Sequence, residues 1–500
     1  MVGRRQPIHD RRAGRRGDVG SDLERGAPRG EHRGISLGRG ASLNLYLVAI
    51  LGYSGLLIVI GLLVGRGVKS TDTFFVAGRN LGPVLLFSTL LAANIGAGST
   101  MGAAGIGYAR GLVGWWWVGS AGLGTLLLAF WVGPRVWRLA KEHDLQTVGD
   151  LLELRYGGAV RGVVAVLLWV TTLFVLAAQL IAVAIVLQSV AGIPKVYGCL
   201  IGGIVVSAYF TAGGLLSSAW VNLVQLVVLT AGFVWIVPAA LDSVGGFSGL
   251  TIETGYTDIW QGGGPALYYM ALLVPAFIIS PGLVQKVYGA RDERTVRIAV
   301  GAAGLALMVF AFLPVLLGMV ARVHFPDLST QALALPTLLV REMPIALGCL
   351  GLAAVFSAEV SSADAVLFML STSLSRDLYR RFVRPDASDA DVLRVARGAA
   401  LVGGLLGVVF AIAFETIIGA LTVFYSFLSV LFFVPVIAAL YTRRAGAPEA
   451  FAAVGLGIPV LIVVDVMTAG RGFGIWNPTL IGLLVSGGAF ISVFAVRRKE

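Results

Sequence analysis

The sequence has little charge, few cysteines and few histidines, and each shortage excludes a class of protein. Only 13% of its 500 residues are charged, whereas a soluble globular domain carries about 25%. The two cysteines, Cys199 and Cys349, lie far apart within apolar runs, which excludes a disulfide framework. The four histidines have no ligand spacing, so we expect no zinc site.

The chain is nevertheless basic, with a net charge of +11. Its Lys and Arg residues stand in short clusters between apolar runs rather than in one stripe, so we expect no nucleic-acid partner. No nucleophile–base pair or metal cluster is apparent, which argues against an enzyme and against an organic cofactor. This composition favours a protein embedded in membrane lipid.

Long apolar runs are what the sequence has in abundance. About 20 apolar residues cross the hydrocarbon core of a bilayer, and these runs lack the alternation of a membrane strand. Helices then satisfy the backbone, so we predict an all-α membrane protein with about 13 transmembrane helices. The runs lie at about 43–64, 81–104, 114–138, 160–190, 194–214, 218–241, 265–288, 298–321, 344–374, 397–414, 417–441, 449–468 and 476–496.

The distribution of basic residues between the runs predicts the orientation. Most Lys and Arg residues lie in every second loop and in a basic tail at 497–500, and the positive-inside rule makes this set cytoplasmic. We therefore expect a multi-pass inner-membrane protein with its C-terminus in the cytoplasm and its N-terminus outside. Trp115–Trp117 would then belong to an outer aromatic belt. The alternate loops carry only Arg110, Lys195, Arg322, Arg341 and Arg471.

Residues 1–42 differ from the membrane domain at 43–496, being rich in Arg and Gly and almost free of large apolar residues. Such a segment cannot bury a core, so we expect it to be disordered. Placed outside, it breaks the positive-inside rule. Either the tail is tolerated there or the natural start lies near residue 40, and we favour the second.

Helix breakers interrupt two of the expected helices. One run contains Asn-Ile-Gly-Ala-Gly at 94–98, and another contains Ser-Pro-Gly at 280–282. If the core repeats are two five-helix halves, at about 81–241 and 265–441, these are the first helices of the two halves. Matched breaks of this kind mark a transport site at the membrane midplane, although Gly alone also serves close helix packing.

The run at 344–374 carries three oxygens on one helix face. The carbonyl of Ala358 and the hydroxyls of Ser361 and Ser362 follow an i, i+3, i+4 spacing. Carbonyls freed at Ala92 and Ile95, just before the first break, would complete the oxygen shell of a hard cation such as sodium. The alternative is that the hydroxyls only bond their own helix or a neighbouring one.

Two carboxylates lie in the same run. A charge at the midplane costs about 2.5–3.5 kcal/mol, so a functional role is the default for Glu359 and Asp364. Asp364 shares the side of Ser361, whereas Glu359 points elsewhere. Asn94 and Asn222 are further polar residues within the membrane, for which helix–helix contact is an equal alternative.

Several motifs make the chain similar to a known family. They are Phe75–Gly82 with Ala93–Ile95, Tyr209–Leu215 with Trp220 and Gln225, Gln285–Arg291, Ser361–Asp364, Ser371–Ser373 and Arg376–Tyr379. With these motifs, residues 43–496 resemble the sodium:solute symporter family, whose core is similar to the LeuT-type five-plus-five inverted repeat. The resemblance implies a sodium site made by the carbonyls of Ala92, Ile95 and Ala358 and the hydroxyls of Ser361 and Ser362. This is the same site that the residue spacing suggests. Asn222 stands where the family often has an Asp linked to sodium exit or a second sodium, which puts a second sodium in doubt.

The resemblance and the two breaks predict sodium-coupled symport by alternating access. Half-helix N-termini favour anionic groups, so a small carboxylate or an amino acid is the expected solute. A proton-coupled carrier that uses Glu359 or Asp364 is one alternative, and a transporter-like membrane sensor is another. The candidate solute contacts are Gly96, Ser99, Thr100, Gln179, Ser280 and Tyr425.

Overall fold

The computed structural model describes residues 44–65 and 75–497, apart from the side chains of residues 62, 64–65 and 208–217. The predicted tail at 1–42 and most of the basic tail at 498–500 lie outside these residues. Within the described part of the chain the structure is helical, with two isolated β-bridges, Leu81–Ala290 and Phe473–Trp476. The prediction of an all-α fold is confirmed.

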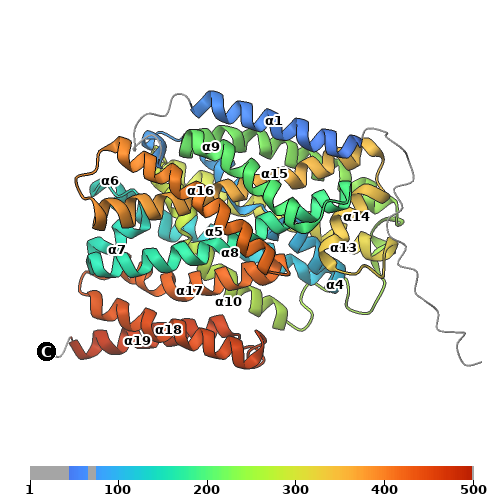
Figure 1. Cartoon of the computed structure of the whole chain (residues 1–500). Coiled ribbons are helices and arrows are strands. Elements are labelled where there is room, and N and C mark those ends of the chain that lie inside the picture. Colours follow the sequence, from blue (N-terminus) through green and yellow to red (C-terminus); the bar gives the residue numbers. More distant parts are fainter. Residues whose placement is uncertain (1–43, 66–74, 498–500) are drawn as a thin grey trace, which may run out of the picture. The chain divides into compact units, whose positions relative to one another are not determined.

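The apolar runs form helices close to where the sequence places them (Figure 1). The long helices among them are apolar around most of their circumference, as expected where they are buried or face lipid. The helices are α1 (Leu45–Gly65), α3 (Pro83–Asn94), α4 (Ala103–Arg110), α5 (Trp115–Leu127), α6 (Gly133–Glu142), α7 (Val148–Tyr156), α8 (Gly158–Ala191), α9 (Lys195–Asp242), α10 (Gly264–Ile279), α11 (Pro281–Tyr288), α12 (Glu293–Phe310), α13 (Phe312–His324), α14 (Ala334–Arg341), α15 (Ile345–Thr372), α16 (Asp389–Ala413), α17 (Ile417–Tyr441), α18 (Ala447–Thr468) and α19 (Pro478–Arg497).

The number of membrane crossings stays a prediction. Among the described residues, 10 helices are long and apolar enough to span a membrane, and three shorter apolar helices lie at Leu45–Gly61, Pro83–Asn94 and Lys195–Ser207. The two runs expected at 194–214 and 218–241 are joined without a loop in α9. The glycine pair Gly213–Gly214 at the end of the first run does not interrupt the helix.

Both predicted breaks are present. α3 ends at Asn94, and Ile95 has an extended backbone, with φ −100° and ψ 103°. The π-helical turn η2 (Gly98–Gly102) then leads into α4. In the second half, α10 ends at Ile279 and Ser280 adopts φ −49° and ψ 119° before α11 begins. Pro281 suits the first position of a helix because the N–H that it lacks would have no partner there.

α15 forms the buried axis of the bundle. Every residue from 354 to 372 is buried, and the helix packs against α3, α8, α9 and α16. α8 of the first five-helix half thus lies beside α15 of the second. Polar side chains on α15 have no access to surrounding water, so they need partners inside the protein.

α1 and the pair α18–α19 lie on opposite sides of this core (Figure 1). α1 packs against α9 and α15, whereas α18 and α19 pack against each other and α17. Their outward side chains are apolar, and Val466 and Met467 are 75% exposed. Apolar surface of this kind suits a lipid environment.

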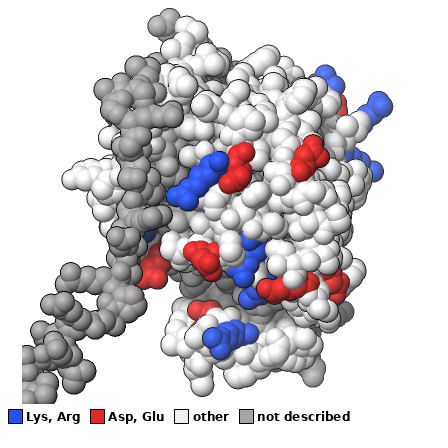
Figure 2. Space-filling model, turned by 90° about the vertical axis from the view of Figure 1, so that its right-hand side faces the viewer, with Lys and Arg blue, Asp and Glu red and all other residues white. Residues whose placement is uncertain are grey.

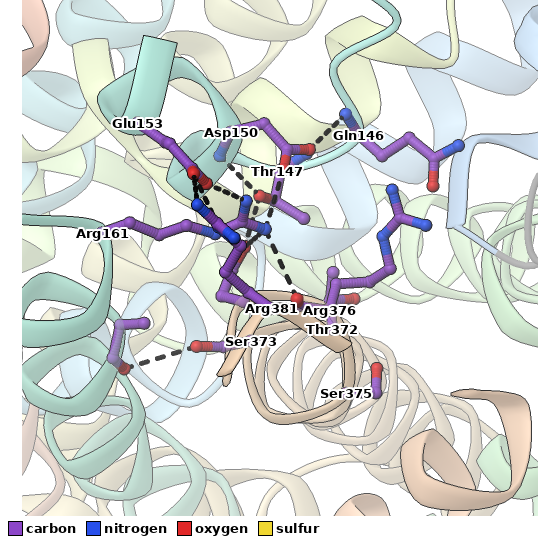
Figure 3. A network of polar contacts seen from close by, with 12 residues as sticks. Gln146, Thr147, Asp150, Glu153, Arg161, Thr372, Ser373, Ser375, Arg376 and Arg381 are labelled. Carbon is purple, nitrogen blue, oxygen red and sulfur yellow. Dashed lines mark hydrogen bonds and ion pairs between the residues drawn. The ribbon is translucent and has the colours of Figure 1, made fainter. Parts of the chain in front are cut away.

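A buried ionic cluster joins α7, α8 and the π-helical segment η7 (Ser373–Val383) that continues α15 (Figure 3). Guanidinium nitrogens of Arg161 lie 2.7 Å from carboxylate oxygens of Glu153 and Asp377, and 2.8 Å from Asp150. Arg381 approaches Glu153 from the other side, at 2.6 Å. Burial alone would raise the pKa of Glu153, but its bonds to the two guanidinium groups hold that pKa below its ordinary value.

The opposite end of the bundle carries scattered charges. Arg110, Arg322 and Arg341 lie in the last turns of α4, α13 and α14, so three of the loops with few basic residues share this end. Figure 2 faces it and shows acidic and basic side chains singly or in small groups on an otherwise uncharged surface. The two ends therefore differ as the sequence predicts, while the end that faces the cytoplasm stays a prediction.

We predict that Arg161→Met destabilises the protein strongly, by about 3–5 kcal/mol, because it leaves buried carboxylates without their cation. Thermal unfolding of the purified protein in detergent measures this loss. Arg297→Met is the matched control, because Arg297 pairs with Glu293 at the surface, with a side chain that is 52% exposed. That change should cost at most about 1 kcal/mol. Equal melting temperatures for the two variants would contradict the assignment.

Candidate functional site

The oxygens proposed for sodium converge between the first break and α15. The hydroxyl oxygen of Ser361 lies 3.0 Å from the carbonyl oxygens of Ala92 and Ala358. That of Ser362 lies 3.0 Å from the carbonyl oxygen of Ile95 and 3.3 Å from that of Ala92. The structure thus brings together all five residues chosen from the sequence, and their role as sodium ligands stays a proposal.

The broken backbone at this point is held by one side chain from another helix and by one from the turn that follows the break. The amide of Ala97 donates to Oε1 of Gln179 on α8, at 2.8 Å. The hydroxyl of Ser99 donates to the carbonyl of Asn94, at 2.7 Å. A break inside a membrane persists only where such partners replace the lost helical bonds.

Gly96 is required by the close approach of two helices. A Cβ added there would lie 2.3 Å from the hydroxyl oxygen of Ser362 and 2.7 Å from Oε1 of Gln179. Neither Ser362 nor Gln179 can move away without losing a hydrogen bond to the broken helix. Gly96 therefore serves both packing and backbone geometry, which the sequence alone could not separate.

A cavity of about 70 Å³ lies next to these oxygens. It is large enough for ordered water or part of a small solute. Five of the six predicted solute contacts line it: Gly96, Ser99, Gln179, Ser280 and Tyr425. Asn94 lines it as well, and its side-chain Nδ2 has no hydrogen-bond partner.

Thr100 is the predicted solute contact that the structure places elsewhere. Its hydroxyl donates to Oε1 of Glu359 on α15, at 2.7 Å, and lies 2.9 Å from the carbonyl of Gly96. The π-helical turn η2 rotates Thr100 away from the cavity, whereas Ser99 stays on the cavity side. A sequence spacing that assumes a regular helix after the break cannot predict this rotation.

Aromatic residues form one wall of the cavity, and the sequence analysis missed two of them. Trp117, Phe277 and Tyr425 line it together. The ring centroids of Trp117 and Tyr425 are 6.2 Å apart, and those of Phe277 and Tyr425 are 5.3 Å apart. Nε1 of Trp117 donates to the carbonyl of Gly98, at 3.0 Å, which fixes the ring against η2.

The tryptophan run was assigned to a lipid-facing belt, and that assignment is wrong. Trp115, Trp116 and Trp117 are all buried. Each indole N–H donates to a backbone carbonyl, those of Met308, Ile259 and Gly98 respectively. The signal that could have identified them is their place in the helix that follows the broken one, within the same half.

Asp364 and Asn222 belong to a polar network beside the sodium candidates rather than to the cavity lining. Asp364 accepts a hydrogen bond from the hydroxyl of Ser218 on α9. Nδ2 of Asn222 lies 3.1 Å from the hydroxyl oxygen of Thr89 and 3.3 Å from that of Ser218. Lys286 on α11 is also buried, with its ammonium 6.0 Å from the ring centroid of Phe368, one turn beyond Asp364 on α15.

Glu359 faces away from the five oxygens, as its spacing predicts. It is fully buried, one carboxylate oxygen accepts from Thr100, and the other has no hydrogen-bond partner. Its contact therefore links α15 to the turn η2 that follows the first break. Neither Glu359 nor Asp364 lines the cavity.

Comparisons with known sequences agree with this architecture. The sodium/pantothenate symporter of Escherichia coli strain K12 is 28% identical over 457 residues, which cover 85% of this chain and 91% of that protein. The sodium/glucose cotransporter of Vibrio parahaemolyticus is 25% identical over 414 residues, covering 72% and 73% of the two chains.

Solved structures show the same fold. A Na+-coupled sialic acid symporter in a substrate-bound outward-open state matches with a TM-score of 0.77 at 18% identity, over 90% of this chain and 97% of that chain. A nucleobase-cation-symport-1 family transporter matches with a TM-score of 0.57 at 14% identity, over 84% and 92%. Residues 74–457 match the model of the sodium:solute symporter family, and because this match spans most of the sequence, the chain belongs to that family.

Proposed function

We propose that the protein couples the uptake of a small organic solute to sodium at the site described above. The observation that carries the proposal is the convergence of three carbonyl and two hydroxyl oxygens, from Ala92 to Ser362, between the first break and α15. Hard cations prefer oxygen ligands of this kind. The five ligands are neutral, so a bound sodium ion adds a full positive charge to the site.

The surroundings of the cavity support alternating access. On one side, Leu421 and Ile418 of α17 pack so closely on Gly98 and Gly102 that a Cβ there would lie 2.6 and 2.7 Å away. On the other side, a Cβ at Gly282 would lie 2.8 Å from the sulfur of Met369. Each contact joins a broken helix to a continuous one, so rocking of one set against the other would open one side at a time.

The cavity favours a solute with a carboxylate and an apolar or cationic part, such as an amino acid. The side-chain donor of Asn94 without a partner lines the cavity, and the N-terminal ends of η2 and α11 lie at the two breaks. Such ends attract anionic groups. The wall formed by Trp117, Phe277 and Tyr425 suits the rest of the molecule, since aromatic faces accept both apolar groups and cations.

The proposed orientation places the ionic cluster of Arg161 in the cytoplasm. The basic loops and the segment after α19 lie there by the positive-inside rule, and the N-terminal side of α1 lies outside. In that orientation sodium enters from the end shown in Figure 2. One positive charge moving through 100 mV contributes about 2.3 kcal/mol, or roughly a fiftyfold accumulation of solute.

We predict that uptake into proteoliposomes needs an inward sodium gradient, because the five ligands have no group that must titrate. A panel of carboxylates and amino acids, each tested with sodium, potassium or choline outside, measures this requirement. Uptake that is equal in potassium or choline and driven by a pH gradient would favour the proton-coupled alternative through Glu359 or Asp364.

Ser361→Ala and Ser362→Ala should each raise the half-saturating sodium concentration about five- to more than a hundredfold. Each change removes one oxygen from the shell, at a cost of roughly 1–3 kcal/mol, and leaves the backbone of α15 intact. Uptake against sodium concentration at matched expression measures the shift. Asn222→Ala is the control and should shift it less. If only Asn222→Ala shifts the sodium dependence, the site lies on α9 and our assignment fails.

Gly96→Ala should weaken both sodium binding and uptake, because the added methyl group would overlap Ser362 and Gln179. Overpacking of this kind also costs about 1–3 kcal/mol of stability. Gly55→Ala in α1 is the matched control, since a Cβ there meets nothing within 4 Å. Parent-like sodium activation in Gly96→Ala would show that the close approach at the break is not needed.

A further inference from the structure

Gln225 on α9 has a buried carboxamide that the proposed function does not use. Its relative exposure is 1%, and neither its Nε2 nor its Oε1 has a hydrogen-bond partner. Within the described part of the chain, it is the one side chain with two buried polar atoms that both lack a partner. Buried amides are nearly always bonded, so an amide without partners requires an explanation.

Gln225 lines a narrow cavity that is too tight to hold a water molecule. Its lining includes Ala92 and Ile95 from the first break and Ser361 from α15, together with Gln225. These three residues supply three of the five oxygens proposed for sodium. The unpartnered amide and the sodium candidates therefore face the same space.

The register between α3 and α9 explains this placement. Asn222 on α9 bonds to Thr89 on α3, and the two helices pack together. One turn further along each helix, Gln225 reaches the level of Ala92, whose carbonyl is a proposed ligand. The amide nitrogen of Asn222 has partners there, whereas neither polar atom of the Gln225 side chain has one.

The rest of the cavity lining offers Gln225 only one other polar side chain, and that side chain already has a partner. Its remaining lining residues are Leu226, Leu229 and Ser357. The two leucines are apolar, and the hydroxyl of Ser357 is already hydrogen-bonded to Tyr53 of α1. What remains is the cluster of carbonyl and hydroxyl oxygens at the break.

We propose that Oε1 of Gln225 is a further ligand of the sodium ion, completing the shell from the α9 side. The proposal rests on the sodium site described above and extends its five oxygens to six. An amide oxygen is a hard, neutral donor of the kind that such cations accept, and six oxygens is an ordinary number for them. Ion binding would then join three helices, α3, α15 and α9, where the hydroxyls alone join two.

The test compares sodium-dependent thermal stabilisation of the purified full-length protein, titrated with sodium chloride and balanced with choline chloride. Gln225→Leu should raise the half-stabilising sodium concentration about five- to more than a hundredfold, because it deletes one ligand. Its melting temperature without sodium should not fall, because Leu removes two unpaired polar atoms. Ser357→Ala is the control from the same cavity and should keep the parent's sodium dependence.

Gln225→Glu provides a second variant should Gln225→Leu fold poorly. A carboxylate in place of the amide should lower the half-stabilising sodium concentration, and it should lower the melting temperature in choline, where the buried charge has no cation beside it. The inference is overturned if either folded variant keeps the parent's sodium dependence while Ser361→Ala shifts it. If Ser361→Ala has no effect either, the sodium site itself fails, so the two failures can be told apart.

Discussion

The need to pair every backbone polar group away from water is the constraint on which this structure depends. Two helices are broken within the bundle, and each break frees amides and carbonyls that lipid cannot satisfy. At the first break, Gln179 accepts a hydrogen bond from the amide of Ala97, and the hydroxyls of Ser361 and Ser362 on α15 donate to the freed carbonyls. The same groups that repair the break are the ones that can hold an ion, so the fold and the proposed chemistry have one cause.

This constraint also explains why α15 carries so many polar residues although its residues 354–372 are all buried. Its hydroxyls face the first break, Asp364 accepts from Ser218 on α9, and Glu359 accepts from Thr100 after the break. Each contact joins a continuous helix to its neighbours at one level of the bundle. A change in ion occupancy at Ser361 and Ser362 would therefore alter the contact between α3 and α15, where the two sets of helices meet.

Sequence reasoning predicted those parts of the fold that depend on local chemistry. Apolar runs predicted the helices, and Gly and Pro predicted the two breaks. The i, i+3, i+4 spacing predicted the helix face that carries Ser361 and Ser362. Features that depend on tertiary geometry could not be predicted. The π-helical turn that rotates Thr100 away from the cavity, the buried tryptophans and the position of Gln225 beside the break arise from packing between distant segments.

Neutral ligands also bear on how such a site can release its ion. A carboxylate in the shell would bind sodium more tightly and cancel its charge, so the membrane potential would act less on the loaded site. In this chain both nearby carboxylates are bonded to hydroxyls instead, Asp364 to Ser218 and Glu359 to Thr100. Because the proposed ligands are neutral, the site gains one positive charge when sodium binds. Solute accumulation could then draw on the membrane potential as well as on the sodium gradient, while each ligand bond stays weak enough to break within a transport cycle.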